Sequence, residues 1–149
     1  GCDVNKADNN GRTPVFAAAY NCHTAALELL VKVPGCDVKR ADKDGTTPAY
    51  VAAFKGHTAA LEVLVKAPGC DELLVKAPGC DLNKATKNGA TPAFAAAQSG
   101  HTAALEVLIK AGCNFSQANK SGQTPAYAAD RNRHTAALKL LEKARCDAK

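Results

Sequence analysis

The sequence predicts an all-α repeat solenoid, and three observations support this fold class. The dipeptide Thr-Pro occurs four times along the 149 residues, with spacings of 34, 44 and 33 residues. The motif His-Thr-Ala-Ala-Leu also occurs four times, at His23, His57, His101 and His134, with the same three spacings. Aromatic residues make up only 5% of the chain, and Trp and Met are absent, so Ala and Leu must supply most of the packing. Two motifs that recur in a constant phase indicate stacked structural repeats.

The Thr-Pro motif predicts the first helix of each repeat. A glycine lies before each Thr-Pro with one residue between them, and glycine suits a turn that needs a positive φ. Thr is a good N-cap, and Pro is favoured at the first helical position. A short Ala-rich helix is therefore expected after each Pro, such as residues 14–21. The four glycines are Gly11, Gly45, Gly89 and Gly122.

The His-Thr motif predicts the second helix. In the first copy Leu27, Leu30 and Val31 follow it at spacings i, i+3 and i+4, which place one apolar stripe on a helix. A Gly-Cys pair then indicates the helix end, and a polar stretch such as residues 38–44 leads to the next repeat. Helices of about nine residues are unstable alone, so the units must stack on their neighbours.

This order of motifs resembles the ankyrin repeat family over essentially the whole chain. The motif Asp-x-x-Gly-x-Thr-Pro is followed by Ala-Ala, Gly-His and a Leu-rich helix. The resemblance implies stacked helix-turn-helix units with β-hairpin-like loops, called fingers below, in one ankyrin repeat domain spanning residues 1–149. The expected repeats are residues 8–41, 42–85, 86–118 and 119–149, and residues 1–7 look like the tail of a preceding unit whose helices are missing.

The first departure from the family pattern is an aromatic residue where the family usually has His, two residues after the Pro of Thr-Pro. We expect these rings to pack in the core, where full burial stabilises by about 1.5–3 kcal/mol per side chain. The four residues are Phe16, Tyr50, Phe94 and Tyr127.

The second departure is the 44-residue spacing. Residues 62–71 and 72–81 match at nine of ten positions, so the long repeat contains a ten-residue tandem duplication. We expect Glu62 to Lys66 to dock normally and the insertion to bulge out near 68–78. Asp71 is placed to cap a short extra helix that runs through Ala77.

The fourth repeat is more polar than the others, as expected of a terminal repeat with a polar outer face. Asp130 replaces an Ala, Arg133 replaces the Gly before His, and Glu142 stands where other copies have Val or Ile. These changes predict a C-terminal cap.

Most of the seven cysteines are interpreted as small buried residues. Cys2, Cys36, Cys80 and Cys113 occupy one repeat position, Cys70 is the duplicated copy, and Cys146 falls at the matching place in the last unit. Equivalent residues on stacked helices lie about 8–10 Å apart, which exceeds the Cα separation of about 7 Å that a disulfide allows. Cys22 replaces the Gly before His23 and is a candidate reactive surface thiol.

The sequence predicts neither an enzyme nor a metal or cofactor site. The four His residues all follow the repeat, whereas a catalytic His is normally unique, so we assign them structural roles. No C-x-x-C or H-x-x-x-H spacing supports zinc, and no catalytic triad, phosphate loop or carboxylate pair stands out. No small-molecule substrate is expected.

Charge and hydropathy limit the classes of partner that this chain is expected to bind. The net charge of +5 comes from scattered Lys and Arg residues, which argues against nucleic acid and slightly favours an acidic protein partner. The longest apolar runs, Val15 to Tyr20 and Ala49 to Phe54, are six residues long, well short of the roughly 20 that span a membrane. Many thiols fit an intracellular location, cytoplasmic or nuclear.

The resemblance implies that partners bind the concave face formed by the fingers and the exposed ends of the first helices. The corresponding positions vary between repeats while the rest of each repeat recurs, so specificity can reside there. By position, the candidates are Asn9, Asn10, Arg12, Tyr20 and Asn21, then Lys43, Asp44, Thr46, Phe54 and Lys55, then Lys87, Asn88, Ala90, Gln98 and Ser99, and finally Lys120, Ser121, Gln123, Arg131 and Asn132.

Within this set, Tyr20 and Phe54 fall at the same place in adjacent repeats and are expected to form one exposed aromatic pair. Aromatic and Arg side chains dominate interface energies. The alternative is that both rings only pack on neighbouring stems. Five cations, namely Arg12, Lys55, Lys87, Lys120 and Arg131, add a positive rim that favours acidic partners.

The predicted function is a protein–protein interaction module or scaffold. The alternative is a spacer or assembly segment of a larger multidomain protein whose activity lies elsewhere.

Overall fold

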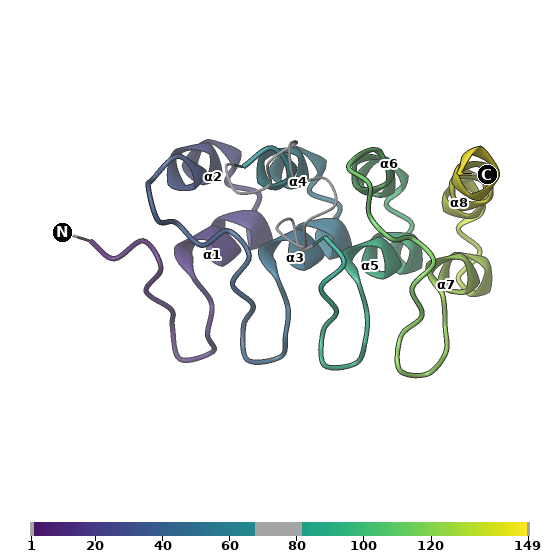
Figure 1. Ribbon diagram of the computed structural model, residues 1–149, viewed down its shortest axis with the longest axis horizontal. Helices are drawn as coiled ribbons and strands as arrows, with labels where there is room; N and C mark the ends of the chain where they lie inside the picture. Colours follow the sequence, from purple (N-terminus) through teal and green to yellow (C-terminus); the bar gives the residue numbers. More distant parts are fainter. Residues whose placement is uncertain (1, 68–81, 149) are drawn as a thin grey trace.

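The computed structural model describes residues 2–67 and 82–148. These residues form eight α-helices arranged as four helix-turn-helix pairs, numbered here as repeats 1 to 4 (Figure 1). The pairs are α1 (Pro14–Tyr20) with α2 (Thr24–Val31), α3 (Pro48–Lys55) with α4 (Thr58–Val65), α5 (Pro92–Ser99) with α6 (Thr102–Lys110), and α7 (Pro125–Arg131) with α8 (Thr135–Asp147).

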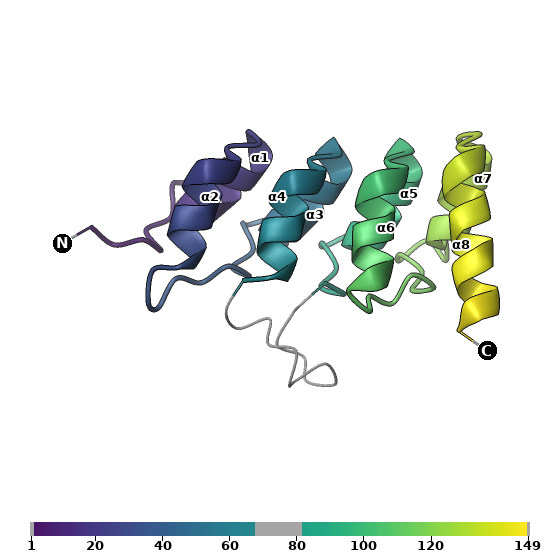
Figure 2. The same cartoon turned by 90° about the horizontal axis from the view of Figure 1, so that it is seen from above.

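The helices stack in two parallel rows. The first helices α1, α3, α5 and α7 form one row, the second helices α2, α4, α6 and α8 form the other, and the fingers project from the first row (Figures 1 and 2). Each helix packs on its partner within the pair and on the equivalent helix of the adjacent repeat. The predicted all-α solenoid is therefore confirmed.

The first helices begin where the Thr-Pro motif predicted. The hydroxyl of each Thr accepts a hydrogen bond from the backbone N–H three residues later, at 3.3 Å in Thr13 and 3.2 Å in Thr91. Thr47 and Thr124 cap their helices in the same way. An N-cap of this kind satisfies one of the free donors in the first helical turn, so the start of each helix is encoded locally.

The fingers are loops closed by hydrogen bonds to one side chain and by backbone bonds, such as that from the N–H of Asp8 to the carbonyl of Arg12. The described residues contain no β-strand. In the first finger the carboxylate of Asp8 accepts bonds from the backbone N–H groups of Asn10 and Arg12, and Gly11 has the positive φ that the motif predicted. The β-hairpin-like loops that the resemblance implied are thus present in outline without a ladder of backbone bonds.

One backbone hydrogen bond joins each finger to the next. The N–H of Lys43 donates to the carbonyl of Asn10 at 3.0 Å, Lys87 donates to Asp44 at 3.0 Å, and Lys120 donates to Asn88 at 3.1 Å. These bonds link the four finger tips into one continuous row.

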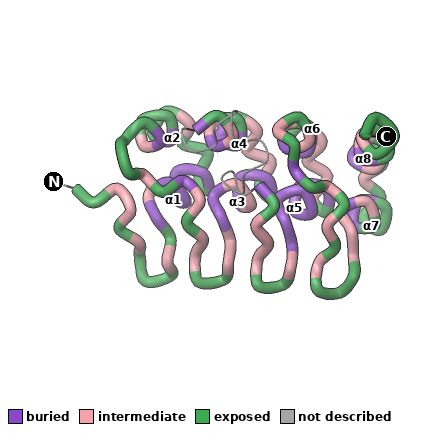
Figure 3. Tube along the Cα trace, viewed as in Figure 1, coloured by how far each residue is buried: buried purple, intermediate pink, exposed green. Residues whose placement is uncertain are grey.

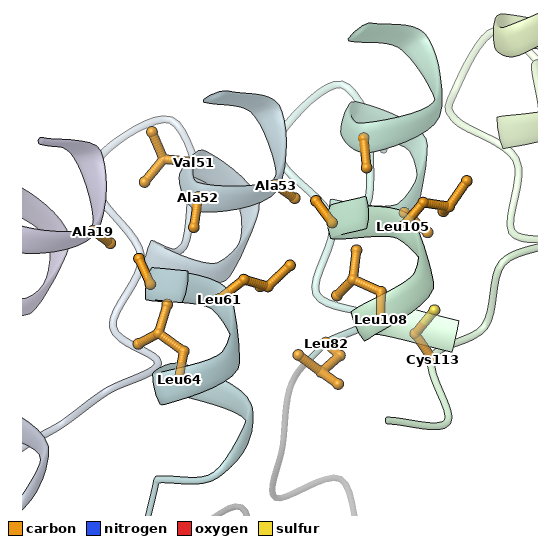
Figure 4. Close-up of a cluster of buried hydrophobic side chains, with 14 of the residues drawn as sticks. Ala19, Val51, Ala52, Ala53, Leu61, Leu64, Leu82, Leu105, Leu108 and Cys113 are labelled. Carbon is orange, nitrogen blue, oxygen red and sulfur yellow. The ribbon is translucent and has the colours of Figure 1, made fainter. Parts of the chain in front are cut away.

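The core lies between the two rows and between neighbouring repeats (Figure 3). Leu27, Leu61 and Leu105 have no exposed surface, and each lies in the first turn of a second helix. Small side chains of the first row, such as Ala52 and Ala53 of α3, are fully buried in the same core (Figure 4). The low aromatic content is possible because alanines let the helices approach closely.

The expected burial of the four aromatic rings is confirmed in two repeats and wrong in one. Phe16 and Phe94 are buried and Tyr50 is partly buried, but Tyr127 is 47% exposed. This position faces the following repeat in the stack, as Phe94 does against Ala128, and among the described residues no further helix pair covers α7. A single motif position therefore has different burial at different places in the stack.

The prediction that the repeat-phased cysteines are buried is wrong at two of the described positions. Cys113 is buried and Cys36 is partly buried, whereas Cys2 and Cys146 are exposed. Cys2 lies ahead of the first helix pair, and Cys146 lies in the last turn of α8, so neither has a repeat on both sides. Cys70 and Cys80 lie outside the described residues.

The helix that contains the start of the first duplicated segment is regular. Glu62 lies within α4, which ends at Val65 with Lys66 as its C-cap, so the normal docking expected for Glu62 to Lys66 is confirmed. The expected bulge near 68–78 and the cap at Asp71 lie outside the described residues.

Candidate partner-binding surface

The finger–helix surface is defined here as the finger tips together with the exposed sides of α1, α3, α5 and α7. All the candidate residues lie on it, and most are exposed, while Thr46, Ser99 and Gln123 are partly buried. Ala90 is the exception, because it is buried against Phe94 and Ala128 in a small separate cluster and is not available to a partner.

Helical spacing explains why these side chains share one face. In α1, Val15 and Ala19 are fully buried in the core, whereas Tyr20 at the last turn is 41% exposed. Phe54 occupies the equivalent place in α3 and is 44% exposed. The same position is exposed in all four repeats, where it holds Tyr20, Phe54, Gln98 and Arg131.

The two exposed rings stack within their own helices. The Tyr20 ring lies 6.5 Å from that of Phe16, and the Phe54 ring lies 6.4 Å from that of Tyr50. Tyr20 and Phe54 are both exposed as expected, but in the described part of the chain no ring contact joins them, and each ring packs on its own helix. The spacing i, i+4 places both rings over the preceding turn of the same helix.

A cation lies at each end of the first aromatic stack. The guanidinium of Arg12 lies 5.5 Å from the ring centre of Phe16, and the ammonium of Lys55 lies 4.5 Å from the ring centre of Tyr20. Both distances are within the range of cation–π attraction. Arg12, Phe16, Tyr20 and Lys55 therefore form a row, called the cation–aromatic row below, that crosses from repeat 1 to repeat 2.

A shallow hollow adjoins this row. Its volume is about 560 Å³. Phe16, Tyr20 and Arg12 line it together with residues of the first finger and of α1, namely Lys6, Ala7, Asp8, Thr13, Pro14, Ala17 and Asn21. Its lining combines apolar residues with charged side chains of both signs, namely Lys6, Asp8 and Arg12.

Two carboxylates of the fingers already interact with neighbouring groups of the protein. The backbone N–H of Arg12, and after it that of Asn10, donate to Asp8 and lower the pKa of this carboxyl below its ordinary value. Asp42 lies 3.9 Å from the guanidinium of Arg12 with only 5% of its side chain exposed. These carboxylates hold the finger turns and keep their negative charge, so they offset part of the charge of the nearby cations.

Three of the four histidines, His57, His101 and His134, lie at junctions between repeats. The Nε2 atom of His57 lies 3.1 Å from the carbonyl oxygen of Tyr20. The rings of His101 and His134 lie against Gly56 and Gly100, where an added Cβ would come within 2.6 Å of Nδ1. These contacts support the structural role assigned to the histidines, and the sequence alone did not reveal the His–Gly contacts.

No group of three or more His, Cys, Asp or Glu side chains is placed to hold a metal ion in residues 2–67 and 82–148. Within the same described ranges, no helix is long and apolar enough to cross a membrane.

Stacked helix pairs with projecting fingers and a variable exposed face define a helical repeat solenoid. A comparison with protein-family models is more specific, because the model described as ankyrin repeats (3 copies) matches residues 1–73 and 68–149. The chain belongs to the ankyrin repeat family. Ankyrin repeats are generally protein–protein interaction modules and are typically not enzymes. No curated protein matches the chain in a sequence search.

Proposed function

We propose that this chain is an interaction module or scaffold that binds a protein partner through the finger–helix surface, the concave face of the repeat stack. The observation that carries the proposal is the distribution of variation between repeats. Core positions recur, as in Leu27, Leu61 and Leu105, whereas the exposed position at the end of the first helices changes from aromatic to amide to Arg.

The scaffold supports this role because it presents the variable side chains in a fixed order. Capped helices and linked fingers hold the backbone of the surface before a partner arrives. A surface that is already ordered loses less conformational entropy on binding. The cations along the surface favour an acidic partner by steering its approach.

We infer further that the chain is not itself an enzyme and needs neither a cofactor nor a small-molecule substrate. Three further points stay predictions. They are an intracellular location, the absence of nucleic acid and membrane partners, and the single domain with the repeat boundaries given above. The spacer or assembly role is the alternative, and it differs in requiring no partner on the finger–helix surface.

The proposal is tested by comparing two matched quadruple variants in affinity capture from cell extract, with quantitative mass spectrometry. The first replaces one position of the first helices in every repeat: Tyr20→Ala, Phe54→Ala, Gln98→Ala and Arg131→Ala. The control replaces one exposed position of the second helices in every repeat: Glu28→Ala, Glu62→Ala, Glu106→Ala and Lys139→Ala.

We expect the first variant to lose specific partners that the control retains, while circular dichroism shows both to be folded. Identical partner sets on both variants, or losses confined to the control, would exclude the finger–helix surface and favour the spacer role.

A further inference from the structure

Charge is distributed unevenly between the two halves of the repeat stack. Residues 82–148 contain nine Lys or Arg against four Asp or Glu, whereas residues 2–67 contain eight against seven. Repeats 1 and 2 are therefore nearly neutral, and the cations of the cation–aromatic row lie close to the carboxylates of Asp8 and Asp42. The positive excess of the described residues belongs to repeats 3 and 4.

The turns of the fingers explain part of this difference. In repeats 1 and 2 the side chain that accepts the backbone N–H bonds of the turn is a carboxylate, Asp8 or Asp42. In repeat 3 the hydroxyl of Thr86 accepts one such bond at 3.3 Å, and in repeat 4 the amide oxygen of Asn119 accepts two, at 2.9 and 3.0 Å. The same turn is thus closed by neutral groups in the last two fingers, so the loss of the carboxylates leaves the turns intact.

Three exposed cations lie on the finger–helix surface of repeats 3 and 4. Lys87 and Lys120 lie at the finger tips, and Arg131 lies at the end of α7. The backbone N–H of Lys120 donates to the carbonyl of Asn88, the residue after Lys87, at 3.1 Å, so the two lysines extend from adjacent tips. The guanidinium of Arg131 lies 3.4 Å from the neutral hydroxyl of Tyr127. Lys87, Lys120 and Arg131 are called the basic patch below.

No described carboxylate neutralises the basic patch. The one salt bridge within residues 2–67 and 82–148 joins Arg12 to Asp42, in the other half of the stack. Asp130 precedes Arg131 in the chain, but its equivalents Ala19, Ala53 and Ala97 have no exposed surface. That position therefore points along the stack, to the side of the finger–helix surface.

Neutral hydrogen-bonding groups surround the basic patch. Asn88 and Ser121 are exposed at the finger tips, and Gln98 is exposed at the end of α5. The exposed ring of this half, Tyr127, occupies the position of Phe94, which faces along the stack and not toward the fingers. Single strands of nucleic acid are typically held by aromatic rings that stack on the bases, whereas cations among amides and hydroxyls suit the carboxylates and backbone of a peptide.

We propose that the basic patch of repeats 3 and 4 binds an acidic segment of the partner protein. Asp and Glu side chains of this segment pair with Lys87, Lys120 and Arg131. The neighbouring amides and hydroxyls, such as those of Gln98 and Ser121, hydrogen-bond to its backbone. This inference rests on the proposed function and adds the chemistry of the bound segment and the half of the surface that it occupies.

The test starts with selection of a random peptide library displayed on phage against the full chain. Selected peptides are synthesised, and their Kd values are measured by fluorescence anisotropy for the chain and for two triple variants of equal net charge. The first variant removes the basic patch: Lys87→Gln, Lys120→Gln and Arg131→Gln. The control removes three exposed cations at the ends of the second helices: Lys32→Gln, Lys66→Gln and Lys110→Gln.

We expect the selected peptides to be rich in Asp and Glu. Loss of the basic patch should weaken binding about tenfold or more, because each exposed ion pair contributes up to about fivefold and three are lost. The control should change the Kd less than about twofold, and circular dichroism should show both variants to be folded. Raising the salt concentration should weaken binding, because exposed charges are screened.

A double variant, Thr86→Asp with Asn119→Asp, tests the charge of the fingers without removing a cation. It places in fingers 3 and 4 the turn-closing carboxylates that fingers 1 and 2 already accommodate at Asp8 and Asp42. We expect it to weaken binding of the acidic peptides several-fold while the fold is retained. Unchanged binding would contradict the role assigned to the neutral turns.

Four other results would overturn the inference. Equal losses in the two triple variants would show attraction by net charge alone. Peptides that lose affinity with Tyr20→Gln or Phe54→Gln, but not with loss of the basic patch, would place the site in repeats 1 and 2 and leave the proposed function standing. A single-stranded RNA oligonucleotide that bound the basic patch more tightly than the peptides would make it a nucleic-acid surface. Failure to select any peptide sensitive to either half of the finger–helix surface would count against both the inference and the proposed function.

Discussion

The residue directly before the His of the His-Thr motif, in the turn between the two helices of each repeat, has a left-handed backbone conformation in all four repeats. Gly56 and Gly100 both have a φ of 73°, and at the equivalent positions Cys22 has a φ of 57° and Arg133 one of 62°. For an L-residue with a side chain this conformation costs roughly 1–2 kcal/mol. Repeats 1 and 4 therefore carry a local strain that repeats 2 and 3 avoid.

Substitution of Gly56 by Ala is expected to destabilise the protein for two separate reasons. The positive φ costs roughly 1 kcal/mol or more for Ala, and the new Cβ would lie 2.6–2.8 Å from the ring of His101. Urea unfolding should show a larger loss for Gly56→Ala than for Gly112→Ala, because Gly112 also has a positive φ but has no atom within 4 Å of the added Cβ.

The double variant Gly56→Ala, His101→Ala separates these causes. When measured relative to His101→Ala alone, the Gly56 substitution should cost no more than Gly112→Ala. An unchanged cost in that background would show that the His101 contact is not the reason.

Thiol reactivity should follow the position of each cysteine in the stack. Burial raises the pKa of Cys113 to about 12, so very little of this thiol is in the reactive thiolate form near pH 8. Exposed Cys22 and Cys146 should react with iodoacetamide well before Cys113, as followed by peptide mass spectrometry. Labelling in denaturant is the control, in which the rates should converge. Equal labelling of Cys113 and Cys22 in the native protein would contradict the burial.

For single elements, the boundaries of helices can be predicted from the local sequence, whereas the contacts between loops cannot. Each first helix begins at the Thr-Pro that predicted it, because an N-cap acts through hydrogen bonds within the same turn. The bond from Lys43 to Asn10 joins two fingers 33 positions apart. No local pattern marks that bond, since its partners meet only when the repeats stack.

Removal of one cap should have a measurable cost. Thr91 is fully buried and caps α5 through the backbone N–H of Phe94, so Thr91→Ala should lower the free energy of unfolding by about 1 kcal/mol, within the usual 0.5–2 kcal/mol for a lost cap. Thr91→Ser keeps the hydroxyl and is the matched control in the same urea titration. If Ser and Ala were equally destabilising, lost packing of the methyl group and not the cap would be responsible.

At the scale of the whole molecule, burial depends on how many neighbours a repeat has. Ala26 in repeat 1 is exposed, whereas the equivalent Ala60 and Ala104 have no exposed surface. At the other end Leu138 is only partly buried, although Leu105 holds the same motif position and is fully buried. Identical motif residues therefore differ in their contribution to stability.

Leu105→Ala should accordingly cost about 2–5 kcal/mol, as expected for a fully buried Leu, and Leu138→Ala should cost clearly less. Urea unfolding followed by circular dichroism measures both. These variants make the same chemical change in the same motif, so each is the control of the other. Equal losses would show that the end repeat is packed as tightly as the interior ones.

The surface chemistry shows where prediction from the sequence stops. Tyr20 and Phe54 were predicted to be exposed by their repeat position, and they are, at 41% and 44%. Their ring partners, and the approach of Lys55 to Tyr20, were not predicted, because the two residues are 35 positions apart and meet only across a repeat junction. The exposure of Tyr127 was missed because a motif does not record whether a neighbour covers it.

The helical repeat, the helix starts, the left-handed glycines of the fingers and the face that carries the variable residues could all be predicted from the amino-acid sequence. These features depend on local hydrogen bonds and helical periodicity, which act within one repeat. Three features emerge only when the repeats stack: which copies of a motif residue are buried, which cations lie against which rings, and where the hollow beside α1 forms. Those features depend on contacts between repeats, because stacking brings together side chains that are about one repeat apart in the chain.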